Sequence, residues 1–279
     1  MTTTLLVART GLSQVVGDYW SNAPSANSGD ASGVTDTDLS PWPNSWFNGW
    51  WSLLRPGASR NIKRVTGFTS STGIYTVTPN HDATPLTTMT YELHKYDPGL
   101  KTEALNEAAT ELYFYLFKVD YDQVIVTVNN QWQYTPTADI INIRNIKYQV
   151  DTTYTDSPYR QLCRGRDWDW RNNEGTAKIQ FYSTFGATTP SSHLEICHVK
   201  PLEVLTADTD VATISDADDL RLWYTVAARI LYEKLASASV GEVRRVYTEE
   251  ATKKDAFARI LKGRCRNRWP SDYYMVGGN

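Results

Sequence analysis

Short runs of alternating apolar and polar residues fill residues 46–98, and turn-forming residues separate them. Side chains alternate along a β-strand, and each run has the length of a single strand. The Ser-Ser-Thr-Gly sequence at residues 70–73 is typical of the turns between them. The pattern predicts a small antiparallel β-barrel or curled sheet without a catalytic residue, and we expect its strands at residues 50–54, 61–68, 74–78 and 90–94.

A helix is predicted directly after this stretch. Asp97 is suited to cap its N-terminus, and Pro98 fits the first helical position. The apolar face that follows is broad, so we expect a buried helix between two β units. Its apolar residues recur at helical spacing at Leu100, Ala104, Ala108, Leu112 and Leu116.

The rest of the chain first returns to strand periodicity and then ends in helices. Alternating Val and Ile residues after residue 122 predict a second β-sheet or sandwich. Apolar stripes at helical spacing after residue 215 predict a C-terminal helical hairpin. The sequence therefore predicts an α+β protein with five parts: an N-terminal segment and flexible arm (1–45), a small β domain (46–96), a linking helix (97–118), a second β domain (119–210) and the helical hairpin with its tail (211–279).

The arm is predicted from the composition of residues 21–41, which are small, polar and acidic. A long loop without structure is uncommon inside a compact domain. Two interpretations remain open: an arm that becomes ordered on a neighbouring subunit, or a flexible segment.

Composition narrows the class of protein without choosing a function. The net charge of −3 does not favour nucleic-acid binding by the whole molecule, and 41% of the residues are hydrophobic, which is enough for a core. The three cysteines are far apart and form no CxxC pair, which argues against a zinc knuckle or a disulfide framework. No signal-peptide pattern or long apolar run is recognised, so we expect no membrane association and a reducing cytoplasm as the place of synthesis.

Asp167 and Asp169 are the best candidates for paired catalytic carboxylates. On a strand both would face the same way, about 6.5–7 Å apart, as in a glycosidase pair. The neighbouring Trp168 and Trp170 are suited to stack on a sugar ring. The alternative is an ordinary strand with its polar face outward and its tryptophans inward, since no nearby residue defines a cleft.

A metal cluster is the second chemical candidate. Alternation along a strand would place His193, Glu195 and Cys197 on one face, while His198 would point away. A fourth ligand would have to come from elsewhere, and a solvated strand face with a buried cysteine is the alternative. We therefore predict no metal, no cofactor and no enzymatic activity.

The C-terminal helical region has an excess of basic residues between residues 242 and 268. This indicates either a cationic surface for an acidic partner or an ordinary solvated helix face. An acidic arm and a basic helix at opposite ends of the chain would suit head-to-tail contacts in a ring.

Several motifs resemble the structural proteins of tailed bacteriophages. They are GWW (Gly49–Trp51), RPGASRN (Arg55–Asn61), KRV (Lys63–Val65), TGIYTVTP (Thr72–Pro79), TYELHKYDP (Thr90–Pro98), LNEAATELY (Leu105–Tyr113) and SDADDLRLWYTVAARILYEKL (Ser215–Leu235). The resemblance covers about half of the chain, and its motifs are structural. It implies a virion protein of the neck, a head–tail connector or adaptor, that is assembled in the host cytoplasm. The large β regions depart from compact helical adaptors and leave open a stopper, tail-terminator or fibre-attachment role.

The resemblance also implies partners: further copies of the chain in a ring, commonly twelve-fold, the portal and tail or neck proteins, and packaged DNA nearby. A carbohydrate-binding or receptor-binding fibre component is the alternative function. The candidate interface residues are Arg55, Arg60, Arg64, Arg259, Arg264, Arg266, Arg268 and Trp269.

Overall fold

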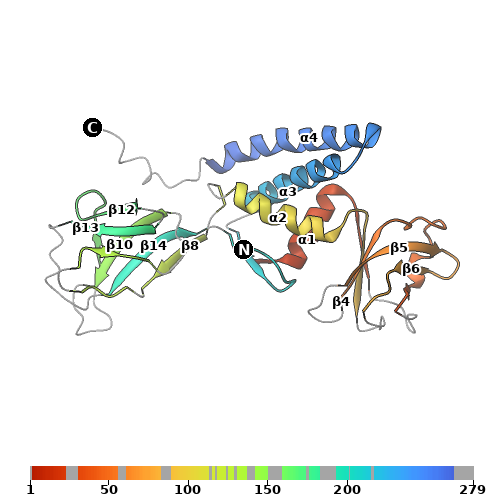
Figure 1. Ribbon diagram of the computed structural model, residues 1–279, viewed down its shortest axis with the longest axis horizontal. Helices are drawn as coiled ribbons and strands as arrows, with labels where there is room; N and C mark the ends of the chain where they lie inside the picture. Colours follow the sequence, from red (N-terminus) through yellow and green to blue (C-terminus); the bar gives the residue numbers. More distant parts are fainter. Residues whose placement is uncertain are drawn as a thin grey trace. The chain divides into compact units, whose positions relative to one another are not determined.

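The computed structural model shows a mixed α+β protein with four helices and several antiparallel sheets in its described residues (Figure 1). The chain divides into two compact units, which we describe separately. Unit 1 comprises residues 1–112 and 203–267, and unit 2 comprises residues 113–202 and 268–279. The structure describes residues 2–22, 31–55, 61–82, 89–112, 115–116, 118–123, 125–128, 131–136, 142–149, 159–173, 176–182, 193–200, 202–214 and 217–266.

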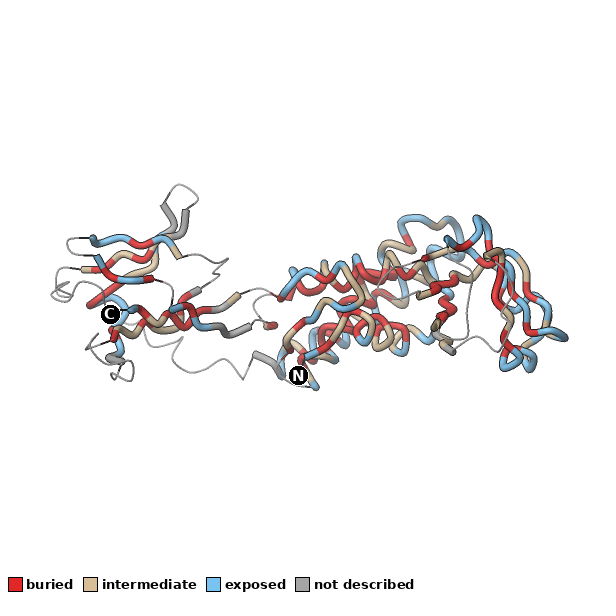
Figure 2. The backbone as a smooth tube through the Cα atoms, turned by 90° about the horizontal axis from the view of Figure 1, so that it is seen from below, coloured by how far each residue is buried: buried red, intermediate tan, exposed pale blue. Residues whose placement is uncertain are grey.

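The helices of unit 1 form a bundle in which α3 (Ala217–Ser237) packs against α1 (Leu5–Val16), α2 (Pro98–Glu111) and α4 (Gly241–Arg266). Buried residues line the sides of these helices that face one another (Figure 2). A short sheet of β1 (Thr2–Thr4) and β15 (Val211–Thr213) brings the two separate stretches of unit 1 together. Each helix in the described part of the chain is too short or too polar to cross a membrane.

The caps of the first two helices follow from their sequences. Thr4 accepts a hydrogen bond from the Val7 backbone N–H and starts α1, which Gly17 ends with a positive φ of 69°. Asp97 caps α2 through the Gly99 N–H, as predicted. However, α2 ends at Glu111, where the predicted linking helix would continue to residue 118. The prediction is wrong there because Lys118 already belongs to a strand of unit 2.

A curled six-stranded antiparallel sheet, the half-barrel, completes unit 1. Its strand order is β2-β7-β4-β5-β6-β3. Ten buried side chains, among them Phe47, Tyr75 and Tyr91, form its core. The bounds of its strands are β2 (Tyr19–Asn22), β3 (Gly33–Thr35), β4 (Trp51–Arg55), β5 (Asn61–Thr69), β6 (Ile74–Thr78) and β7 (Thr90–His94).

The half-barrel includes part of the segment that was predicted to be a flexible arm. β3 pairs with β6, and a short 3-10 helix, Thr37–Leu39, follows it. Val34 and Leu39 are fully buried in the core of the half-barrel. The prediction of an arm is therefore wrong for residues 31–41, because these two apolar side chains fix a polar segment to the sheet. Residues 23–30 lie outside the described part of the chain.

Unit 2 contains a four-stranded antiparallel sheet, β11-β10-β14-β8, and a three-stranded one, β12-β13-β9. Ten buried residues from both sheets and the segments beside them form one core, with Trp168 and Ile179 fully buried in it. The strands are β8 (Lys118–Asp122), β9 (Gln133–Tyr134), β10 (Asn142–Gln149), β11 (Tyr159–Leu162), β12 (Trp168–Asn173), β13 (Thr176–Phe181) and β14 (Leu194–Lys200).

Candidate functional site

A network of buried charged side chains joins the half-barrel to the helices of unit 1. Glu92 on β7 has no exposed side-chain surface and lies between two guanidinium groups. Arg9 of α1 approaches one of its carboxylate oxygens at 3.4 Å, and Arg55 of β4 approaches the other at 3.1 Å. Arg9 also pairs with Asp208 at 3.0 Å. Burial alone would raise the pKa of Glu92, but His94 and the two arginines together lower it.

Lys101 of α2 forms the second half of this network and has no exposed side-chain surface. Its ammonium group donates to Ser13 Oγ at 2.7 Å, to Asp18 Oδ1 at 2.8 Å and to His94 Nδ1 at 2.9 Å. An ammonium group has three N–H donors, so all of them are used. Burial lowers the pKa of Lys101 to about 8, although the Asp18 carboxylate opposes the shift.

His94 connects the two halves, and its contacts determine its tautomer. Lys101 has only donors, so His94 Nδ1 must accept, and the ring proton is on Nε2. This Nε2–H donates to Glu92 Oε2 at 2.8 Å. Burial lowers the pKa of His94 to about 4, and the Lys101 charge adds to the effect. The histidine is therefore neutral at neutral pH.

The network is balanced in charge and closed to solvent. Arg9, Arg55 and Lys101 contribute three positive charges, and Glu92, Asp18 and Asp208 contribute three negative ones. The most exposed of these side chains, that of Arg55, is only 16% exposed. A substrate would have to reach side chains that the fold covers. We therefore assign the network the role of fastening β7 to α1 and α2.

A second buried polar cluster lies within the half-barrel. Ser52 Oγ lies 2.9 Å from the Tyr75 hydroxyl and 3.4 Å from His81 Nε2. A serine next to a histidine is the arrangement of an activated nucleophile, but Ser52 is fully buried. Burial lowers the pKa of His81 to about 4, and the Tyr91 hydroxyl donates to Asp36 nearby. The cluster pairs the Ser52, Tyr75 and Tyr91 hydroxyls within the core and offers no exposed nucleophile.

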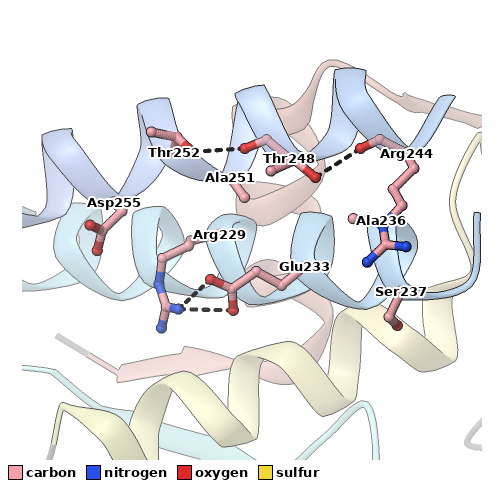
Figure 3. A pocket seen from close by; sticks show the side chains of 9 residues that line it. All are labelled: Arg229, Glu233, Ala236, Ser237, Arg244, Thr248, Ala251, Thr252 and Asp255. Atoms are coloured by element: carbon pink, nitrogen blue, oxygen red, sulfur yellow. Dashed lines mark hydrogen bonds and ion pairs between the residues drawn. The ribbon is translucent and has the colours of Figure 1, made fainter. Parts of the chain in front are cut away.

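One open feature of unit 1 is a groove between α3 and α4, with a volume of about 470 Å³ (Figure 3). Ala236 and Ala251, which line it, are small and buried and so leave space between the two helices. On the α3 side Arg229 donates to both carboxylate oxygens of Glu233, at 2.7 and 2.9 Å. The remaining lining residues are Ser237, Arg244, Thr248, Thr252 and Asp255.

Some polar side chains of this groove already have hydrogen-bond partners within the chain, and the charge of Arg244 is not balanced by an ion pair with any described residue. The Thr248 and Thr252 hydroxyls donate to the carbonyl oxygens four residues earlier, so only their oxygens remain as acceptors. Arg244 of α4 points toward Ala236 and Ser237 (Figure 3). No acidic side chain among the described residues pairs with it in an ion pair. Arg244 therefore makes the groove suitable for an acidic group of another molecule.

The structure distributes the predicted interface residues over several places. Arg55 belongs to the buried network, whereas Arg64 is exposed with its guanidinium 5.4 Å from the centre of the Trp51 ring. Arg259 is 79% exposed and pairs with Asp255 at the edge of the groove. Arg264 is exposed near the end of α4. Arg266 is the last residue of α4, and Arg60, Arg268 and Trp269 lie outside the described residues.

The Asp167–Trp170 motif does not present two exposed tryptophans, which the candidate sugar site would require. Trp168 has no exposed surface, and its indole N–H donates to the Leu162 carbonyl. Asp167 accepts from the Cys163 N–H at 2.8 Å and pairs with Arg166. Asp169 forms an ion pair with Arg164, whose Nε lies 3.6 Å from Asp169 Oδ1. Each carboxylate is therefore held by neighbours, and one of the two tryptophans belongs to the core of unit 2.

The candidate metal cluster is also not assembled within the described residues. No group of three or more potential ligands converges there. Glu195 pairs with Lys147 at 2.7 Å, which lowers the pKa of the carboxyl group, and Cys197 and His198 are buried. The motif forms part of β14, in which Leu194 and Ile196 face the core of unit 2.

Sequence reasoning missed both the buried network and the groove. One signal was present for the network: Arg9 interrupts the apolar helix Leu5–Val16, and Lys101 precedes Leu105 and Ala108 on the apolar face of α2. A charged residue on a buried face requires a partner. No protein-family model matches the chain, and no curated protein is significantly similar to it in sequence.

Proposed function

We propose that the chain is a structural protein of a tailed-phage virion, a head–tail connector subunit that assembles as a ring between portal and tail. It acts by binding other proteins and not by catalysis. The observation that carries this proposal is the contrast between its two kinds of charged site. The large ionic network is closed and internally paired, whereas the α3–α4 groove is open and presents Arg244.

The motif resemblance supplies the virion context for this proposal. The matching motifs include parts of β4 to β7, α2 and α3, which are the elements that the buried network and the helix bundle join. In a connector, such a joint keeps the half-barrel fixed against the bundle while neighbouring proteins bind. We further propose three finer features of the architecture. The half-barrel is a small β-barrel, the two sheets of unit 2 form a sandwich, and α3 and α4 form a helical hairpin.

Binding to a portal ring tests this function. The full-length protein is mixed with the portal protein of the phage whose genome encodes it, and the mixture is imaged by electron microscopy. We expect a ring of subunits on one end of the portal. Arg244→Glu is expected to reduce binding more than Arg259→Glu, because Arg259 already has Asp255 as a partner. A wild-type protein that never binds the portal would refute the proposal.

A carbohydrate-binding fibre component is the second candidate, and one observation favours it. Trp46 is 48% exposed and stacks on Trp42, with ring centres 5.5 Å apart. A rigid exposed indole is suited to stack on a sugar ring. Glycan-array binding that Trp46→Ala abolishes would support this candidate over the connector.

A further inference from the structure

Helix α4 has a second uncovered face. The groove lies on one side of the contact between α3 and α4, and this face lies on the other side. Four apolar side chains on this face are between 40% and 57% exposed, namely Val243, Val246, Phe257 and Ile260. Exposed apolar residues are ordinary when they are scattered singly. These four share one face of a single helix, which indicates a contact surface.

The face follows the spacing of a coiled-coil seam. Starting at Val243, the steps alternate between three and four residues, through Val246, Glu250, Lys253, Phe257 and Ile260. This alternation keeps all six positions on one side of a helix, in register with a partner helix. The two central positions are charged, and charged seam positions specify register and orientation. We call these six residues the α4 seam.

The α4 seam is also palindromic. Counted from its centre, Val243 corresponds to Ile260, Val246 to Phe257 and Glu250 to Lys253. In an antiparallel pair of identical helices, each residue therefore meets its counterpart. Apolar residues meet apolar residues at both ends, and Glu250 meets Lys253 twice at the centre. In a parallel pair Glu250 would lie beside Glu250 and Lys253 beside Lys253, so like charges disfavour that arrangement.

We infer that two copies of the chain associate through an antiparallel α4–α4 contact with two-fold symmetry. The occupant of the seam is a second copy because the apolar and charged positions complement themselves. The contact extends over about 25 Å, from the rise of 1.5 Å per residue between Val243 and Ile260. Within one chain Glu250 and Lys253 pair with each other at 2.6 Å, and both remain accessible, at 35% and 68% exposure.

One side chain of the seam has a contact within its own chain. The guanidinium of Arg221 lies 5.8 Å from the centre of the Phe257 ring, and Phe257 is still 40% exposed. An arginine on one face of the ring keeps the phenyl group in place and leaves its other side for a partner. The inference is independent of the connector function, because it concerns the association of free subunits.

A charge-swap experiment tests the inference. In Glu250→Lys both central positions are positive, and in Lys253→Glu both are negative, so either variant alone places like charges opposite each other. We expect the wild type to sediment at twice 31.6 kDa and each single variant to dissociate at least about tenfold more readily. An equal mixture of the two variants should recover the dimer, because opposite charges then meet at both central contacts. The double variant should recover it alone.

Two further measurements separate this result from misfolding and from other contacts. Circular dichroism and thermal melting verify that each variant is folded, and Val7→Lys, at an exposed valine on α1, is the matched control that should remain dimeric. In the variant Val246→Cys/Phe257→Cys, an oxidative cross-link should join position 246 of one copy to position 257 of the second copy. A monomeric wild type, or a dimer that both single variants retain, would overturn the inference. Portal binding by such a protein would leave the connector function standing.

Discussion

Replacing Lys101 by methionine tests whether the buried network holds unit 1 together. Among the residues that the structure describes, Lys101 is the cation that pairs with Asp18, so the change leaves that carboxylate buried without its counter-charge. The Tyr96 N–H, which donates to Asp18 Oδ2 at 3.0 Å, cannot compensate for a full charge. Removing one partner of a buried pair typically costs about 3–5 kcal/mol. For a unit of this size, that corresponds to a decrease in Tm of roughly 6–20 °C.

The matched control is Lys234→Met. Lys234 on α3 also pairs with two carboxylates, Glu103 and Glu107, but it is 29% exposed. Solvent screens such pairs, so the control is expected to lose at most about 1 kcal/mol. Urea unfolding followed by far-ultraviolet circular dichroism measures both variants, because all four described helices lie in unit 1.

A double-mutant cycle with Asp18→Asn completes the test. Asparagine keeps an acceptor for the Tyr96 N–H and carries no charge. The double variant should therefore lose less stability than the sum of the single variants, with a coupling of about 1–3 kcal/mol. If Lys101→Met costs no more than Lys234→Met, the network does not stabilise unit 1 and the reasoning is refuted.

The pKa of His94 is lowered to about 4, so the unfolded chain binds more protons between about pH 6.5 and 4, and stability should fall over this window as the pH decreases, by up to about 3 kcal/mol. The pKa of His81 is lowered in the same way and adds a similar contribution, so His94→Gln should remove about half of the combined pH dependence in urea titrations; an unchanged pH dependence would contradict the assignment. Trp168→Ala should cost unit 2 about 3–5 kcal/mol and lower its near-ultraviolet melting transition, while the helical signal of unit 1 is unaffected. Asn106→Ala removes both side-chain hydrogen bonds to the Leu205 backbone, each 2.9 Å long. Hydrogen exchange at the Leu205 amide should therefore become faster. An exchange rate equal to that of the wild type would show that these bonds do not hold the segment.

Local signals in the sequence predicted the elements well. Turn residues and alternation located β4 to β7 of the half-barrel, and Asp97 with Pro98 located the start of α2, because these signals act over a few residues. The mixed α+β class is confirmed on this basis. The end of α2 was missed, since apolar spacing continues past Glu111 although the chain leaves the helix.

Long-range pairing was not predictable from local patterns. β2 and β3 are near in sequence but lie at opposite edges of the half-barrel, and no local pattern determines that order. The partners Arg9 and Glu92 are 83 residues apart, so the sequence indicates that each charge needs a counter-charge but not which residue supplies it. The palindromic spacing of the α4 seam is visible in the sequence. Only the structure shows that this face of α4 is uncovered.

The division of unit 1 into two stretches has a consequence for synthesis on the ribosome. α1, α2 and the half-barrel emerge first, but α3, against which both helices pack, follows only after unit 2 has been made. At about 5–20 residues per second, the ribosome needs roughly 5–18 s for residues 113–202. During that interval the apolar faces of α1 and α2 lack their cover. A nascent chain stalled before residue 203 should therefore bind chaperones that the completed chain releases.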